Sequence, residues 1–286
     1  MSSMMEAIVI PKFGGPEVLE FQQVSKPEPA VGEVLISVKA FGINHAEMHM
    51  RKGEWDEWNP ITGLECVGIV EACPGNEIPV GSKVIALMGG MGRERPGSYD
   101  LKAGESILIR GATSTIGQGA VNLAVNAGAK VTGTTRREGR FKMLKDMGVM
   151  NVVLEHDNLA SEFPDGTMFD KVLNLIGNRV LVESIEFTRA DGRMLQAGWL
   201  GGLAPVKDFN PMVEMKPGVH FSLFHSKVLG TAEFPLSGVP LQDIVDKIEA
   251  KAWVAKPTYV FDWKDIRKAH ELLDSHNAGG KIVAIH

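Results

Sequence analysis

Short runs of alternating apolar and polar residues fill the first hundred residues of the chain. Runs such as EVLISVKAFG and CVGIVEA have the alternation and the β-branched content of strands. Between such runs stand turn segments rich in glycine and proline, such as KPEPAVGE and PGNEIPVGS. Strands at this spacing predict a small β-rich domain, a sheet or a barrel, over residues 1–100.

The pattern changes at Glu105, where near-continuous apolar runs begin to alternate with helix-like segments. SILIRG is followed by the small-residue stretch TIGQGAVNLAVNAG, and AKVTGTT is followed by EGRFKMLKDMG. Strands that are apolar throughout are buried on both faces, which is typical of a parallel sheet covered by helices on both sides. We therefore predict an α/β fold, with a Rossmann-type doubly wound parallel sheet over residues 101–233.

Composition excludes several classes of partner. The chain has 286 residues, 44% hydrophobic and 23% charged, which allows two ordinary domains with a large core. The net charge is −5 without a basic block, so we expect no nucleic-acid partner. No apolar run approaches the ~18 residues of a membrane span, and no signal peptide is visible at the N-terminus. Cys66 and Cys73 form no ligand cluster and are expected to be reduced, so we expect a cytoplasmic protein without a membrane partner.

The stretch ILIRGATSTIGQGAVNLA carries the clearest candidate chemistry. A buried strand ends at Gly111, and a helix is predicted to start near Thr115, so the helix amides and dipole face the loop and favour a pyrophosphate. Gly111 permits the tight turn, Gly117 lets the helix approach the sheet, and Ser114 stands where the usual GxGxxG fingerprint has its middle glycine. The predicted cofactor contacts of this loop are Gly111, Thr113, Ser114, Thr115, Ile116 and Gly117. The alternative is an ordinary strand-to-helix turn without a ligand.

The end of the second strand favours a particular cofactor. An NAD site has a carboxylate there, about 20 residues after the glycines, to accept from the ribose 2′-hydroxyl. This chain reads TGTTRREGR, which places Thr135, Arg136 and Arg140 where a 2′-phosphate would lie. We therefore expect NADP(H) as the cofactor, although Glu138 is a weak counterweight and a solvated basic helix start is the alternative.

Two other classes of nucleotide-loop enzyme are disfavoured. A short-chain dehydrogenase needs Tyr-x-x-x-Lys, but Tyr99 and Tyr259 are followed at the fourth position by Ala103 and Trp263. A methyltransferase would have an acidic residue at the end of the second strand, where this chain has Arg136.

The order of motifs resembles the medium-chain dehydrogenase/reductase superfamily, in particular its zinc-independent quinone oxidoreductase (ζ-crystallin-like) branch. The matching positions are Asn44, Glu47, Arg51 and Gly53, then Pro60, Gly63, Glu65, Gly68 and Val70, then Gly81, Ser82 and Val84. Glu47 and Ser82 depart from the aspartates of the family pattern. FDKVLNLIG, GRMLQAG and the closing DIRKAHELLDSHNAGGKIVAIH also match, so the resemblance covers nearly the whole chain.

The resemblance implies a GroES-like β-rich domain, formed by residues 1–100 and 234–286, beside the Rossmann domain. It implies a catalytic role for Asn44, cofactor contacts at Gly177 and Gly198, and a homodimer that pairs through an edge strand at 227–231. The superfamily's alcohol dehydrogenases hold zinc through a cysteine that GINHAEMH lacks. His45 and His49 are spaced like a helical metal pair but have no third ligand in view, so we expect no metal site.

One join departs from the family pattern. GSY is normally followed by a strand and interdomain helices, whereas here Tyr99 and Asp100 lead directly to LKAGE at Leu101. About 40 residues that the pattern would supply are absent, so the β-rich domain is expected to be incomplete.

Two functions follow from these observations. The first is a zinc-independent, NADPH-dependent reductase of quinones or of α,β-unsaturated carbonyl and enoyl substrates, which accept hydride at an electrophilic carbon without an alkoxide-stabilising metal. The second is an NADP(H)-binding protein whose catalysis is impaired by the deletion and which acts as a binding or sensor protein.

Overall fold

The computed structural model describes residues 3–54, 59–87, 101–225, 228, 231, 234–235, 237 and 239–286. The chain divides into two compact units, Met1–Met91 with Pro257–His286, and Gly92–Lys256. Residues 234–256 thus belong by their contacts to the second unit, whereas the sequence assigned them to the first; the predicted domain boundaries stay a prediction. The join at Tyr99 and Asp100 lies outside the described residues, as do residues 227, 229 and 230 of the predicted dimer strand.

The first unit is built on a five-stranded sheet of strand order β12-β13-β3-β4-β5 and a separate hairpin, β1-β2. Its strands are β1 (Met4–Val9), β2 (Glu20–Ser25), β3 (Leu35–Ile43), β4 (Glu65–Ala72), β5 (Lys83–Leu87), β12 (Tyr259–Asp262) and β13 (Ile282–Ile285), and its helices are α1 (His45–Lys52) and α7 (Ile266–Asp274). Only β12 and β13 pair in parallel among these strands. The closing stretch DIRKAHELLDSHNAGGKIVAIH forms α7 and β13, and β13 pairs with β3 from the N-terminal part of the chain.

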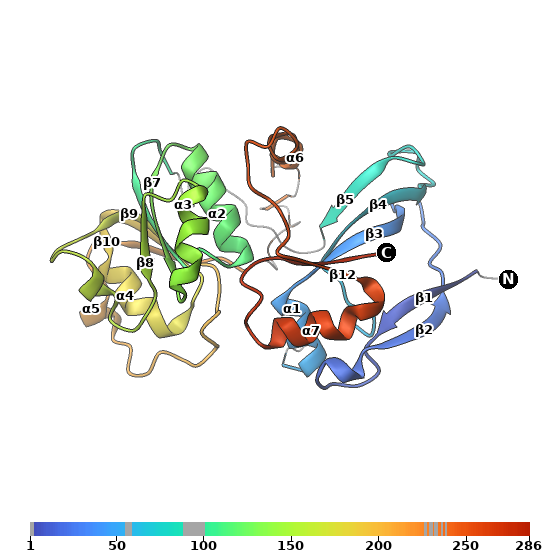
Figure 1. Ribbon diagram of the computed structural model, residues 1–286, viewed down its shortest axis with the longest axis horizontal. Coiled ribbons are helices and arrows are strands. Elements are labelled where there is room, and N and C mark those ends of the chain that lie inside the picture. The colour runs from blue at the N-terminus through green and yellow to red at the C-terminus, as the bar shows by residue number, and fades with distance from the viewer. Residues whose placement is uncertain are drawn as a thin grey trace. The chain divides into compact units, whose positions relative to one another are not determined.

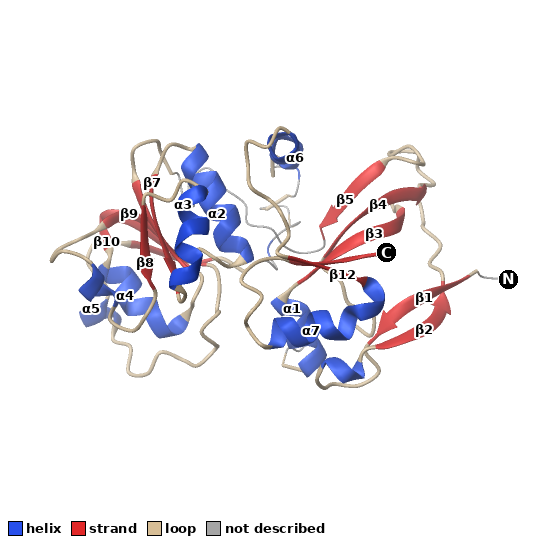
Figure 2. Cartoon of the chain, in the orientation of Figure 1, coloured by secondary structure: helices blue, strands red, loops and turns tan. Residues whose placement is uncertain are grey.

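The core of the first unit lies on one face of its sheet. α1 and α7 contact each other and cover this face, as Figure 2 shows. Met48 of α1 and Leu273 of α7 pack there against Ile282 and Ala284 of β13. Successive strand residues point to opposite faces, so Ile285 points away from this core and is 48% exposed.

The second unit is a six-stranded parallel sheet of order β11-β10-β9-β6-β7-β8. Its strands are β6 (Ser106–Arg110), β7 (Lys130–Thr135), β8 (Asn151–Leu154), β9 (Phe169–Asn174), β10 (Thr188–Gln196) and β11 (His220–Leu223), and its helices are α2 (Thr115–Asn126), α3 (Phe141–Asp146), α4 (Leu181–Glu186), α5 (Pro211–Glu214) and α6 (Leu241–Glu249). This strand order is that of the doubly wound dinucleotide-binding fold. The predicted fold class is therefore confirmed for this unit.

Apolar side chains cover both faces of this sheet. Ile107 and Ile109 of β6 pack on α2 and α3, while Leu108 packs on the opposite side against Leu181 and Ile185 of α4. Figure 1 shows α2 and α3 side by side over one face. The uninterrupted apolar run in SILIRG follows from this burial on both sides.

None of the helices in the described part of the chain is both long enough and apolar enough to cross a lipid bilayer.

Candidate functional site

The loop between β6 and α2 is shaped by two glycines. Gly111 has φ +83°, a left-handed conformation that glycine adopts without strain. A Cβ at Gly117 would lie 2.4 Å from the carbonyl oxygen of Gly111 and 2.7 Å from the Cα of Ala112. The first turn of α2 therefore lies against the loop at a distance that no other residue type permits, as the spacing of the two glycines predicts.

The start of α2 presents backbone donors to this loop. Ser114 precedes the helix in an extended conformation, and its Oγ accepts a hydrogen bond of 3.1 Å from the amide of Gly117. The first intrahelical hydrogen bond runs from the amide of Gln118 to the carbonyl of Ser114, so the helix itself leaves the amides of Thr115 and Ile116 free. Free amides and the positive end of the helix dipole make this an anion-binding position.

The second strand contributes a hydroxyl to the same loop. Thr135 ends β7, and its Oγ1 lies 3.2 Å from Oγ1 of Thr113. Arg136 follows and is exposed, and Arg140 is half-buried at the turn that leads into α3. The chain has no carboxylate at the last residue of β7 or the two that follow it.

Gly177 and Gly198 follow β9 and β10 and allow the two loops after these strands to touch. A Cβ at Gly177 would lie 2.9 Å from the Cα of Trp199, and one at Gly198 would lie 2.6 Å from the carbonyl oxygen of Leu175. Gly111 lies beside these two loops as well, because a Cβ at this position would meet Leu200 and Leu175 at 3.1 and 3.4 Å. The structure thus brings the predicted glycines together at one edge of the sheet.

Asn174, which was not predicted as a site residue, fixes the loop after β9. Its side chain is fully buried, Oδ1 accepts from the amides of Ile176 and Gly177 at 2.9 Å each, and Nδ2 donates to the carbonyl of Gly177 at 3.0 Å. The available signal was one amide residue inside the otherwise apolar run VLNLI.

These loops meet where the strand order reverses. β6 pairs with β7 on one side and β9 on the other, and the loops that leave their carboxyl ends run in opposite directions. Ligands of doubly wound folds bind in the crevice at this switch point. The architecture is that of a dinucleotide-binding domain, and the predicted loop residues line its switch point.

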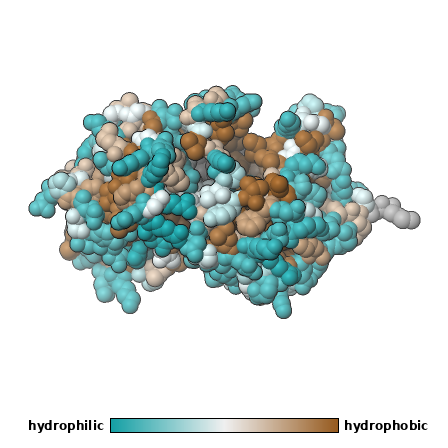
Figure 3. Space-filling model, in the orientation of Figure 1, coloured by the Kyte–Doolittle hydropathy of each residue, from teal (hydrophilic) through white to brown (hydrophobic). Residues whose placement is uncertain are grey.

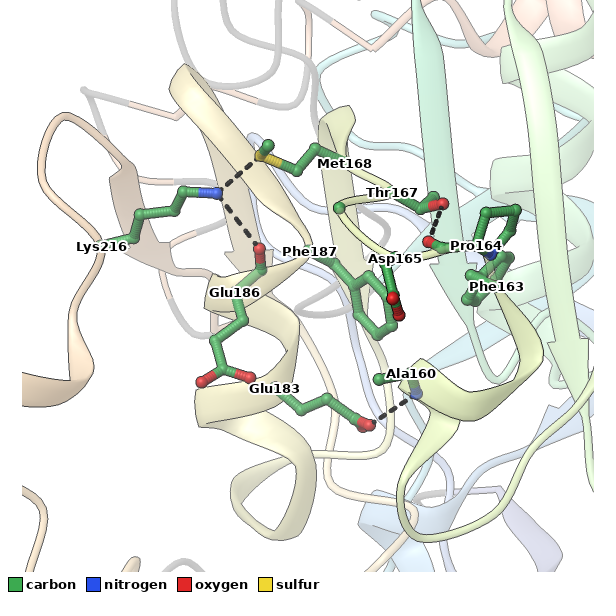
Figure 4. A pocket seen from close by; sticks show the side chains of 11 residues that line it. Ala160, Phe163, Pro164, Asp165, Thr167, Met168, Glu183, Glu186, Phe187 and Lys216 are labelled. Atoms are coloured by element: carbon green, nitrogen blue, oxygen red, sulfur yellow. Dashed lines mark hydrogen bonds between the residues drawn. The ribbon is translucent and has the colours of Figure 1, made fainter.

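A pocket of about 230 Å³ lies at the amino ends of the strands, opposite the loops described above. Its walls come from residues 160–168, which precede β9, and from the C-terminal end of α4. Figure 4 shows Lys216 reaching toward the sulfur of Met168 and the carbonyl of Glu186, with Phe187 behind. The phosphate-type loop stands at the carboxyl ends of the strands, so this pocket lies away from the candidate dinucleotide site.

In the first unit, Asn44 belongs to a polar cluster that spans three strands. Lys281 Nζ donates to Asn44 Oδ1 at 2.7 Å and forms an ion pair with Glu65, and Asn44 Nδ2 lies 3.4 Å from Glu65 Oε1. Gly42 leaves room for this pair, because a Cβ there would overlap both the Glu65 carboxylate and the Lys281 ammonium group. Lys281 was missed as a functional candidate, since it stands 237 residues from Asn44 and only the pairing of β13 with β3 brings them together.

Buried titratable groups surround Asn44. Glu47 accepts a hydrogen bond of 2.6 Å from the amide of Asn44. Burial raises the pKa of Glu47 to about 7, although this hydrogen bond acts to lower it. Burial, with the neighbouring His276, lowers the pKa of His45 to about 4.

The two histidines that are spaced like a metal pair have other partners. The ring of His45 stacks on that of His276, and Nδ1 of His49 lies 2.5 Å from Glu54 Oε2. Within the described ranges, no three His, Cys, Asp or Glu residues are placed to hold a metal ion. The expected lack of a metal site stays a prediction.

Comparison with known families agrees with this architecture. The alcohol dehydrogenase GroES-like domain model matches residues 30–139, and the zinc-binding dehydrogenase model matches residues 115–235. The chain belongs to the medium-chain dehydrogenase/reductase superfamily, in its quinone oxidoreductase branch, and is an oxidoreductase. The predicted resemblance is confirmed.

Individual relatives match over nearly the whole chain. The quinone oxidoreductase of Lama guanicoe is 25% identical, and the alignment covers 99% of this chain and 98% of that protein. A quinone oxidoreductase of Pseudomonas syringae has a similar structure, with a TM-score of 0.84 at 21% identity over 99% of this chain and 100% of the other. A mycobacterial protein solved in complex with NADPH gives a TM-score of 0.84 at 20% identity, with the same coverage of both chains.

The alignment with the guanaco protein is longer than this chain. It runs over 335 positions and covers 99% of the chain, which is about 283 of its 286 residues. About 50 positions therefore hold a residue of the relative and none of this chain. A shortened chain gives an alignment of this kind, while the location of the deletion at Tyr99–Leu101 stays a prediction.

Proposed function

We propose that the chain binds NADP(H) at the switch point of its second unit and reduces quinones or α,β-unsaturated carbonyl compounds. The observation that carries the proposal is the close approach of α2 to the loop at Gly117, which leaves room for no side chain and presents the first amides of the helix. This arrangement suits a pyrophosphate, which is shared by all nicotinamide dinucleotides. Gly111, Thr113, Ser114, Thr115, Ile116 and Gly117 would hold it, with Gly177 and Gly198 shaping the far side of the crevice.

Preference for NADP(H) over NAD(H) rests on the residues after β7. Thr135, Arg136 and Arg140 offer a hydroxyl and two guanidinium groups to a 2′-phosphate, and no carboxylate ends the strand to accept from a free 2′-hydroxyl.

The cofactor, when bound, supplies hydride, and the chain's own groups must hold the substrate oxygen and its proton. Asn44 is proposed as the catalytic residue that hydrogen-bonds the reacting group. Lys281 and Glu65 fix the two ends of its amide, and both are about one-fifth exposed. Reduction of a quinone or an enone generates a phenolate or an enolate, which such hydrogen bonding stabilises.

The test is titration with NADPH and NADH, followed by turnover measurements on quinones and enones. We expect NADPH to bind more tightly, and Arg136→Ala to remove about 1.5–3 kcal/mol of charge-assisted binding, roughly ten- to a hundredfold, from NADPH alone. Lys142→Ala is the matched control, because it removes another exposed positive charge six residues further along, from a residue paired with Asp146. An unchanged NADPH/NADH ratio in Arg136→Ala would contradict the assignment.

A second candidate function is favoured by the alignment with longer relatives and by an apolar row on the first unit. Ile285, Val67 and Ile85 occupy one cross-strand row with Ala40, on the sheet face opposite the core, and are 48%, 42% and 49% exposed. In the view of Figure 3, apolar surface stands among polar residues in the region of this sheet. A chain whose first unit lacks part of its cover would bind NADP(H) at its second unit with impaired turnover and serve as a binding or sensor protein. Cofactor binding without turnover on the quinone and enone panel would support this second function over the first.

A further inference from the structure

A buried ionic cluster lies directly behind the dinucleotide loop, on the α4 side of the sheet. Arg110, the last residue of β6, is fully buried, and its Nη2 donates to Glu155 Oε1 at 2.6 Å. Arg110 Nη1 pairs with Glu183 Oε2 of α4 at 2.7 Å and donates to Ser184 Oγ at 3.2 Å. Glu155 follows β8, and its side chain is 1% exposed.

Thr134 of β7 joins this cluster to the loop. Its side chain is fully buried, and its Oγ1 lies 2.5 Å from Glu155 Oε2. The same Oγ1 accepts a hydrogen bond of 3.0 Å from the amide of Gly111. The carbonyl of Thr134 accepts from the next amide, that of Ala112, at 3.0 Å.

The charges fix the direction of this chain of hydrogen bonds. Arg110 has only donors, so Glu155 must accept from it, through Oε1 at 2.6 Å and through Oε2 at 3.4 Å. The amide of Gly111 is likewise only a donor. The hydroxyl of Thr134 therefore gives its single proton to Glu155 and keeps its lone pairs for the amide of Gly111. Any other arrangement would leave the amide of Gly111 without an acceptor, or would place two acceptor oxygens 2.5 Å apart without a proton between them, and either is costly in a buried site.

We propose that Thr134, Glu155 and Arg110 are positioning residues that hold the peptide of Gly111, and with it the loop up to Ser114, in the conformation that receives the pyrophosphate. This inference rests on the proposed cofactor site. The network contacts the loop on the side of the sheet opposite α2, so it would influence the cofactor only through the backbone of the loop. It contributes equally to every dinucleotide, whereas Arg136 is assigned to the 2′-phosphate alone.

Thr134→Val tests the proposal, because valine has nearly the same shape and no hydroxyl. We expect it to raise the Kd of both NADPH and NADH by about tenfold, the effect of one lost hydrogen bond with an orphaned partner, and to leave their ratio unchanged. Thr132→Val is the matched control, since Thr132 is 3% exposed on the same face of the same strand but meets Asn151 at 3.5 Å, away from the loop. Thr134→Ser, which retains the hydroxyl, should restore binding.

Glu155→Gln is a second test variant. The glutamine amide can donate to Thr134 Oγ1 and compete with the amide of Gly111 for that acceptor. It should weaken both dinucleotides, and the double variant with Thr134→Val should bind no worse than either single variant, since both act through one chain of bonds. Equal effects of Thr134→Val and Thr132→Val on Kd, or additive losses in the double variant, would overturn the proposal.

Hydrogen exchange without cofactor separates this inference from the proposed function. Thr134→Val should speed amide exchange at residues 111–117, and Thr132→Val should not. If the wild-type chain binds neither dinucleotide but the loop responds in this way, the proposed function fails and the positioning role stands. If exchange in the loop is unchanged by Thr134→Val, the positioning role fails whatever the chain binds.

Discussion

The sharpest structural prediction concerns two glycines of α2 that stand two residues apart in different surroundings. A Cβ at Gly117 would approach the carbonyl oxygen of Gly111 to 2.4 Å, whereas a Cβ at Gly119 meets no atom within 4 Å. Side-chain carbons do not approach other atoms closer than 3.0 Å, so Gly117→Ala must displace the first turn of α2 or the loop by about 0.6 Å. Overpacking of this kind costs about 1–3 kcal/mol, and the gain in helix propensity returns only about 0.5–1 kcal/mol.

The two substitutions should therefore have opposite effects. Gly119→Ala should stabilise the chain by about 0.5–1 kcal/mol, a rise in Tm of roughly 1–4 °C, and leave the Kd of NADPH unchanged. Gly117→Ala should lower the Tm and raise that Kd at least about tenfold, because the helix amides no longer face the same point. Thermal unfolding and fluorescence titration measure both quantities. If Gly117→Ala raised the Tm as Gly119→Ala does and bound NADPH normally, the close approach of helix and loop would be wrong.

Two further predictions concern the first unit. Burial holds the pKa of His45 and of His270 at about 4, below the unfolded value of 6.5, so the stability that their neutral forms contribute is complete above pH 6.5 and is lost as the pH falls to about 4. Glu47, with its pKa raised from 4.5 to about 7, acts in the opposite sense: its contribution is complete below pH 4.5 and is lost as the pH rises through 7. Chemical unfolding at pH 7 and at pH 5 measures how far the free energy of unfolding falls between the two pH values, and this fall should be smaller in His270→Gln than in the wild type. In the control His286→Gln, which changes an exposed histidine, the fall should equal that of the wild type. A fall in His270→Gln as large as that of the wild type would refute this. Insertion of the guanaco protein's corresponding segment after Tyr99 should raise both turnover and Tm and slow hydrogen exchange in residues 1–91. A glycine-serine insert of equal length should have none of these effects. If the two inserts had equal effects, the deletion would not be a functional loss.

The parts of the site that follow from local geometry could be predicted from the sequence. The start of α2 at Thr115 and the roles of Gly111 and Gly117 follow because a tight turn between a buried strand and a helix imposes steric demands within a few residues. The parallel sheet of the second unit follows from the alternation of buried strands and helices, since parallel strands need crossover connections that cover both faces of the sheet. Whether Arg136 and Arg140 meet a 2′-phosphate stays a prediction.

The polar networks could not be predicted, because their members are far apart in sequence. Arg110 meets Glu155 and Glu183 across 45 and 73 residues, and the pairing depends on which strands become neighbours and in which register. Lys281 and Asn44 meet only because β13 pairs with β3. A lysine before a final strand, or an arginine at the end of an apolar strand, has the same local pattern whether its partner is a carboxylate or water.

Binding and turnover should respond differently to damage in this chain, because their requirements lie in different units. The proposed dinucleotide site needs only the loops at the carboxyl ends of a sheet that is covered on both faces. Its four glycines, Gly111, Gly117, Gly177 and Gly198, all lie in close contact with other residues of the same unit. Asn44, by contrast, sits in a unit whose core covers one face of the sheet and leaves the row of Val67, Ile85 and Ile285 exposed. A perturbation that opens the first unit therefore removes the amide of Asn44 from its position between Lys281 and Glu65 while the second unit keeps its loop. On mild denaturation or acidification, we therefore expect turnover to be lost before NADPH binding, because the two depend on different cores.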